Sequence, residues 1–174
     1  MSIGNFIEAS LHHYNHKQYD IALALASSAI DATATKCGYI GNNNTKYKDY
    51  LRHNMKTIIT FGFPGISASG IKIKCHNIKG LKTDKEGMID IENIIYHTIR
   101  CGLIHQCDIS QEIEFTEQTI IGDFNQKFKV PKNLVLGLIV SVVQSKCNQD
   151  EYLTQTYNIT NPFSQEKFIL QFGK

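Results

Sequence analysis

The 174-residue chain lacks a strong excess of either charge. Its formal net charge is +2 and its pI is near 8.2, far from the strongly basic balance of a protein that coats nucleic acid. Hydrophobic residues make up 42% of the chain and charged residues 20%, which is typical of a globular protein and excludes disorder throughout. A chain of this length buries about 70% of its unfolded surface, so it can fold without a disulfide or a metal.

Features of exported and membrane proteins are also missing. The first residues, MSIGNFIEAS, contain no basic region followed by an apolar run, so no signal peptide is expected. The longest apolar run covers only residues 134–143, whereas a membrane-spanning helix needs about 20 residues. We interpret this run as a helix buried in the core or at a subunit interface. These absences predict a cytoplasmic protein that does not associate with membranes.

The cysteines do not form a recognisable framework. There are five of them, widely spaced and without a CxxC pair: Cys37, Cys75, Cys101, Cys107 and Cys147. An odd number at such spacing is not typical of a disulfide scaffold or a zinc site. His12 and His16 have a helical spacing that can bind metal, but no further ligand completes the set, so we expect them on the solvated surface. We therefore predict reduced thiols, no metal and no cofactor.

Hydrophobic periodicity predicts a mainly α protein, a helical bundle with a small β-hairpin decoration. The expected helices cover residues 3–14, 17–37, 45–61 (N-capped by Thr45), 88–104 and 131–147 (with Pro131 in the first position). The remaining segments are a long loop over 62–87 with an edge strand near 71–74, a hairpin from 112–115 and 124–130, and a strand in 167–172. We expect one domain over residues 1–174, with a core at about 15–148 and a C-terminal tail at about 149–174.

Two charged residues occur in segments that are otherwise predicted to face the core. Asp31 follows a run of apolar and small residues, and a buried carboxylate is costly without a partner. Arg100 is the best candidate for that partner, because its helix also carries Tyr96 and Leu103. The pair is either a structural ion pair that fixes helix register or a device in which Asp31 holds Arg100 in place for an anion.

Arg100 is followed five residues later by His105, with Gly102 between them. On a straight helix the two side chains would differ by about 140° in direction, so they share a face only if the helix ends or loosens. Arginine binds phosphate through a permanently charged fork, and histidine exchanges a proton near neutral pH. Together they can cleave a phosphodiester without a metal.

The segment from Tyr96 to His105, YHTIRCGLIH, resembles the R-x4-H helix of the HEPN superfamily. The earlier segment 19–34 is similar to the central helix of a bacterial branch of that superfamily, which also carries an Arg-Cys-Gly-Leu-x-His helix. With the helix at 134–143, the resemblance covers about residues 15–148.

The resemblance implies a helical bundle that usually dimerises, so that two R-x4-H motifs lie near one cleft. Many members are metal-independent ribonucleases, often toxins of toxin–antitoxin systems or defence effectors, and others bind ligands without catalysis. By this resemblance His105 would be the general base on the ribose 2′-hydroxyl, and Arg100 would bind the scissile phosphate. We therefore expect a homodimer with RNA or a nucleotide as ligand; the sequence names no antitoxin or regulatory partner.

Two positions depart from the pattern of active members. The residue after the arginine is often polar, such as Asn, whereas here it is Cys101. Toxin members that are silenced by nucleotide transfer carry Tyr two residues after the histidine, and here that residue is Cys107. Three hypotheses therefore stay open: a ribonuclease, a catalytically silent module that binds RNA or a nucleotide, and a structural helical protein in which Arg100 and His105 only satisfy the core.

Overall fold

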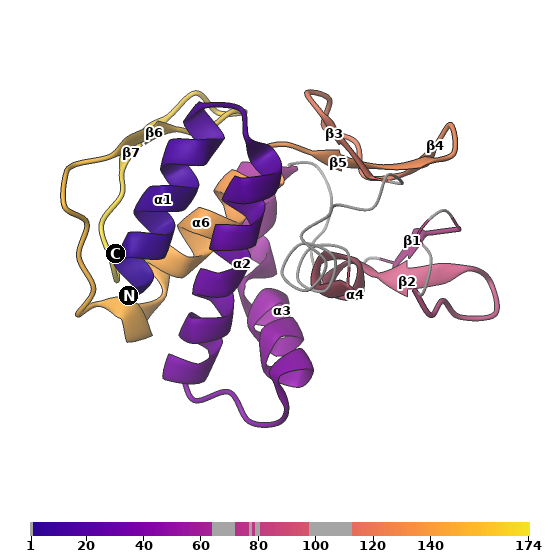
Figure 1. Ribbon diagram of the computed structural model, residues 1–174, viewed down its shortest axis with the longest axis horizontal. Coiled ribbons are helices and arrows are strands. Elements are labelled where there is room, and N and C mark those ends of the chain that lie inside the picture. Colours follow the sequence, from indigo (N-terminus) through magenta and orange to yellow (C-terminus); the bar gives the residue numbers. More distant parts are fainter. Residues whose placement is uncertain (1, 64–71, 77, 79–80, 98–112) are drawn as a thin grey trace.

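The computed structural model describes residues 2–63, 72–76, 78, 81–97 and 113–174, and Figure 1 shows their arrangement. The elements in chain order are α1 (Ile3–Asn15), α2 (Tyr19–Lys36), α3 (Asn43–Gly62), β1 (Lys72–Lys74), β2 (Met88–Asp90), α4 (Ile91–Ile94), β3 (Ile113–Thr116), β4 (Gly122–Phe124), β5 (Lys127–Pro131), α6 (Leu134–Gln144), the 3-10 turn η2 (Lys146–Asn148), β6 (Asn158–Thr160) and β7 (Lys167–Ile169). The prediction of a mainly α protein with a few short strands is confirmed.

Helix α6 occupies the middle of a bundle and packs against α1, α2 and α3 (Figure 1). Every residue from Leu134 to Val143 is buried, as its continuous apolar sequence requires. Its burial within a single chain agrees with the first of the two interpretations of this run, a helix in the core.

Close contact between α3 and α6 depends on glycine. A Cβ atom added to Gly137 of α6 would lie 2.3 Å from the carbonyl oxygen of Ile58 in α3. A Cβ on Gly62, one turn further along α3, would lie 3.2 Å from the Cα of Leu134. The two backbones therefore approach more closely than any side chain between them would allow.

The predicted helix ends are partly wrong. Helix α3 is capped by Asn42, whose side-chain oxygen accepts a hydrogen bond from the Thr45 backbone N–H at 2.9 Å; Thr45 itself lies inside the helix. The fourth helix begins at Ile91 rather than at 88, because 88–90 form strand β2. Pro131 ends β5 instead of opening α6, a strand-end position that suits a residue without an N–H donor.

The expected edge strand near 71–74 is confirmed as β1, and the β structure is otherwise more extensive than predicted. Strands β1 and β2 pair antiparallel, with Ile73 opposite Ile89. In the second sheet the order is β3–β5–β4, and the two segments predicted to form a hairpin, β3 and β5, run parallel. The hairpin partner of β5 is β4. The tail strand near 167–172 is confirmed as β7, which pairs antiparallel with β6.

A disulfide joins Cys37, at the C-terminal end of α2, to Cys147 in η2. The prediction of reduced thiols is therefore wrong for these two residues. Their Cα atoms lie 5.3 Å apart although 110 positions separate them in the sequence, within the range that a disulfide spans. Within the part of the chain that the structure describes, no helix is long and apolar enough to cross a membrane.

Candidate functional site

The predicted site residues divide into two groups. The first group, Arg100, Cys101 and His105, lies outside the described residues. The expected contact between Asp31 and Arg100 therefore stays a prediction. Tyr96 is buried, with 6% of its surface exposed, and its ring lies 5.5 Å from that of Tyr47 in α3 and 5.3 Å from that of His97. Tyr96 therefore anchors the start of the R-x4-H segment to α3.

Asp31 does not lie where the sequence predicted. It is half-buried rather than enclosed in the core, and it lines a surface hollow of about 590 Å³ together with Thr35, Lys36 and Asn43. Apolar residues surround it in the sequence, but its position on α2 turns it toward this hollow. A half-buried carboxylate keeps contact with water, which lowers the cost of burying its charge.

The buried carboxylate of the region is Glu92, in the first turn of α4. Its side chain is 4% exposed, and the Arg52 Nε atom of α3 lies 3.5 Å from its Oε1 atom. A second bond, at 2.8 Å, joins the Arg52 guanidinium to Asp49 one turn earlier on α3. Sequence reasoning missed the Glu92–Arg52 pair, although Glu92 lies one turn before the buried Tyr96 and so faces the same side of the helix.

Lys48 makes a second link between α3 and α4. Its ammonium donates a 3.0 Å hydrogen bond to Asn93, whose side-chain amide in turn donates to Asp90 at 3.3 Å. Residues 95–97 then continue α4 with π-helical hydrogen bonding, a local widening that often occurs at functional sites. The residues that lead into the R-x4-H segment are thus attached to α3 by the ion pair between the exposed Arg52 and the buried Glu92 and by the hydrogen bond between Lys48 and Asn93.

His97 completes the group. It is half-buried, and burial together with the nearby Lys48 ammonium lowers its pKa below 6.5. Its imidazole is therefore neutral at pH 7. Lys48 and His97 place a cation and a neutral imidazole beside the chain three residues before Arg100, whereas the charge of Arg52 is offset by Asp49 and Glu92. Lys48 can attract an anion, because lysine side chains are common protein partners of phosphate.

The described residues contain no group of three or more His, Cys, Asp or Glu side chains that can hold a metal ion. His12 and His16 are exposed, as expected for a solvated helix face. Their rings stack at a centroid distance of 4.3 Å, and the His16 Nδ1 atom lies 2.8 Å from the His12 carbonyl oxygen.

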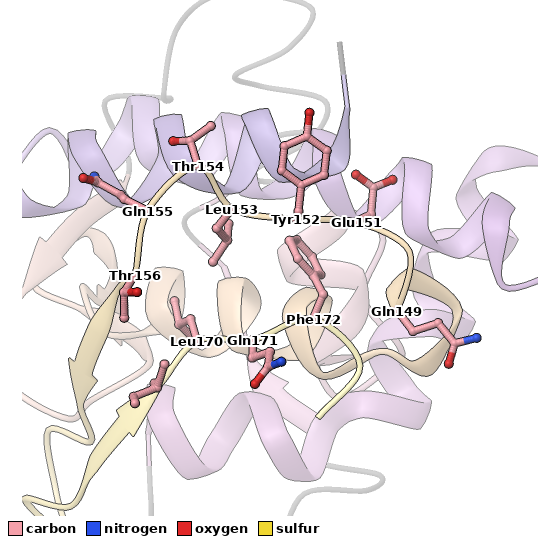
Figure 2. Close-up of a pocket in the computed structure, with 11 residues that line it drawn as sticks. Gln149, Glu151, Tyr152, Leu153, Thr154, Gln155, Thr156, Leu170, Gln171 and Phe172 are labelled. Atoms are coloured by element: carbon pink, nitrogen blue, oxygen red, sulfur yellow. The ribbon is translucent and has the colours of Figure 1, made fainter.

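A groove of about 480 Å³ lies on another face, among C-terminal residues (Figure 2). One wall is the segment 149–156 and the other is the segment 169–172. Leu153 and Phe172 point into the gap between the walls, whereas Tyr152 stands out from it and is 74% exposed. No sequence pattern predicts this groove, because its walls come mostly from irregular segments.

Comparison with known proteins identifies mycobacterial relatives. The chain is 24% identical over 167 residues to the uncharacterized protein Rv1289 of Mycobacterium tuberculosis and to the uncharacterized protein Mb1320 of Mycobacterium bovis. These alignments cover 92% of this chain and 78% of each relative. No solved structure matches the chain significantly. The model of the Rv1289 family matches residues 2–172, and the chain therefore belongs to that family.

Proposed function

We propose that the protein is a HEPN-like endoribonuclease that acts without a metal, with Arg100 and His105 as its catalytic pair. The roles of these two residues come from the resemblance of segment 96–105 to the R-x4-H helix. The observation that supports an anionic ligand is the Lys48 ammonium, which α3 places beside the residues leading into this segment. A toxin, defence or stress role and a homodimeric assembly belong to the same proposal.

The proposed reaction is transesterification within the RNA strand. His105 removes the proton of a ribose 2′-hydroxyl, and the resulting oxyanion attacks the adjacent phosphorus. The bond to the 5′-oxygen of the next nucleotide breaks, and this oxygen takes up a proton as it leaves. Arg100 stabilises the charge that builds on the phosphate oxygens. Lys48 binds a flanking phosphate, which increases affinity for RNA without sequence preference.

The decisive experiment is cleavage of single-stranded RNA in excess chelator. The products should end in a 2′,3′-cyclic phosphate or its 3′-phosphate hydrolysis product, and DNA should survive because it lacks the 2′-hydroxyl. A positioned general base contributes about 10²–10⁴-fold, so His105→Ala should lower the rate at least about 100-fold. His53→Ala is the matched control, because His53 is an exposed histidine on α3. Equal cleavage by the folded His105→Ala protein would refute the proposal and point to a contaminating nuclease.

Cys101 supports a second candidate function. Because it stands where active members often carry a polar residue such as Asn, a catalytically silent module that binds RNA or a nucleotide is the alternative. This alternative predicts no cleavage, but RNA binding that Lys48→Met weakens and makes less dependent on salt. If the protein neither cleaves nor binds RNA or nucleotides, both of these functions are excluded and the structural hypothesis remains.

A further inference from the structure

The strongest remaining feature is the Cys37–Cys147 disulfide at the junction of α2 and the C-terminal region. Cys37 is exposed and Cys147 is half-buried. An exposed sulfur can be approached by an attacking thiolate, and thiol–disulfide exchange requires such access. The bond therefore differs from a structural disulfide that is enclosed in a core.

The segment that follows the bond is held by contacts at the surface. No residue of 149–157 is fully buried, although Leu153 and Tyr157 pack partly against the core and the Thr154 N–H and hydroxyl donate to Glu8 of α1. Lys36 at the end of α2 forms ion pairs with Asp150 at 2.5 Å and with Glu151 at 3.1 Å, and Glu151 also accepts a hydrogen bond from the Gly4 backbone N–H. Ion pairs that water can reach stabilise little.

Both ends of this segment are held much more firmly. Asn148 is fully buried, and its amide donates to Thr33 at 3.0 Å and to the Val142 carbonyl at 2.9 Å. Beyond the segment, Ile159 is buried in β6. Segment 149–157 is thus a bridge between two fixed points. Segments with few buried contacts open locally at a lower free energy than the core.

We propose that Cys37–Cys147 is a thiol–disulfide exchange site, attacked at the Cys37 sulfur by a dithiol reductant, and that its opening loosens segment 149–157 while the helical bundle stays folded. The reductant thiolate bonds to the Cys37 sulfur, the S–S bond breaks, and the electron pair leaves on the Cys147 sulfur, which takes a proton from water. The second thiol of the reductant then attacks its own sulfur in the mixed disulfide and releases Cys37 as a thiol. The protein gains two thiols, and the dithiol becomes a disulfide.

Loosening this segment would alter one wall of the groove in Figure 2. The opposite wall is attached to the bundle, because the Gly173 N–H donates to the Val143 carbonyl at 2.8 Å, and to the segment itself, because the Leu170 N–H donates to the Tyr157 carbonyl at 2.9 Å. Opening of the disulfide would therefore change the shape of the groove mainly at residues 149–156.

The direction of attack is tested with glutathione, a monothiol that leaves the first step trapped as a mixed disulfide. Oxidised protein is treated with glutathione, quenched in acid, and mapped by mass spectrometry of its peptides. The adduct should be at least about 10-fold more abundant on Cys37 than on Cys147, because the attacked sulfur is the accessible one. Predominant adducts on Cys147, or alkylation of both residues before any reductant is added, would overturn the proposal.

The structural consequence is tested by hydrogen exchange with and without dithiothreitol. Amides of 149–157 should exchange at least about 10-fold faster after reduction, whereas those of α6 should not change. Cys147→Ser should show the fast rate in both conditions, and Asp150→Asn, which removes an ion pair but keeps the disulfide, should remain sensitive to dithiothreitol. If Cys147→Ser does not fold, the comparison within the wild-type protein still decides. Equal exchange of 149–157 in oxidised and reduced protein would refute the inference.

Discussion

Replacing Gly137 by alanine tests the packing on which the bundle depends. The added Cβ would lie 2.3 Å from the Ile58 carbonyl oxygen, and an ordinary contact begins at 3.4 Å, so the α3–α6 separation must grow locally by about 1 Å. Overpacking of this kind costs about 1–3 kcal/mol or somewhat more, and alanine recovers up to about 1 kcal/mol of helix propensity. We expect a net loss of about 1–3 kcal/mol in the free energy of unfolding, and a melting temperature lower by about 3–10 °C.

The atom that the new Cβ would meet is the backbone carbonyl oxygen of Ile58, and this allows a second test. Trimming the Ile58 side chain cannot make room, so Ile58→Val should not rescue Gly137→Ala. Gly38→Ala is the control, because a Cβ there meets nothing within 4 Å and the cost comes only from its backbone φ of +79°, about 1–2 kcal/mol. The variants are compared by urea denaturation. Wild-type stability of Gly137→Ala, or its rescue by Ile58→Val, would show that the close approach of α3 and α6 is wrong.

Three further predictions concern titration and the disulfide. Burial raises the pKa of Tyr14 and of Tyr50 to about 12. Both phenols stay protonated in the folded state at a pH where they ionise in the unfolded state, so their contribution to the free energy of unfolding is fully present below pH 10 and is lost as the pH rises toward 12. Unfolding measured at a series of alkaline pH values should show this loss. Burial lowers the pKa of His97, so on acidification the unfolded state takes up a proton at a higher pH than the folded state does. The free energy of unfolding should therefore fall as pH drops below 6.5. In thermal melts at a series of pH values, His97→Gln should lose this part of the pH dependence. Cys37→Ser opens a loop of 110 residues and should lower the unfolding free energy by about 2–4 kcal/mol in urea, whereas equal midpoints for variant and oxidised wild type would contradict the bond.

The long helices could be predicted because their signal is local. The apolar stripes of α1, α2 and α3 repeat within a few residues, and their observed bounds agree with the predicted ones to about two residues at each end. The start of α3 was less certain for a physical reason. Three asparagines precede Thr45, and each of these residues is able to cap a helix. Only the backbone geometry selects Asn42.

Features that depend on distant partners could not be predicted in the same way. Strand β2 has three residues and no measurable periodicity; it exists because β1 pairs with it. The parallel arrangement of β3 and β5 depends on how the intervening chain turns back, which hydrophobic pattern does not encode. The disulfide joins residues 110 positions apart, so no spacing motif marks it.

Asp31 and Glu92 differ in burial, and this difference bears on which of them needs a cation from another helix. The structural hypothesis relied on a buried Asp31 that needs a cation, and Asp31 is half-buried beside a surface hollow. The carboxylate that is buried, Glu92, has its cation in Arg52 of α3. Glu92 therefore does not require Arg100 as its cation. The contact between Asp31 and Arg100 stays a prediction: Asp31→Ala should lower the melting temperature more than Asp150→Ala, because Asp150 is exposed, and equal melting temperatures would contradict the pairing.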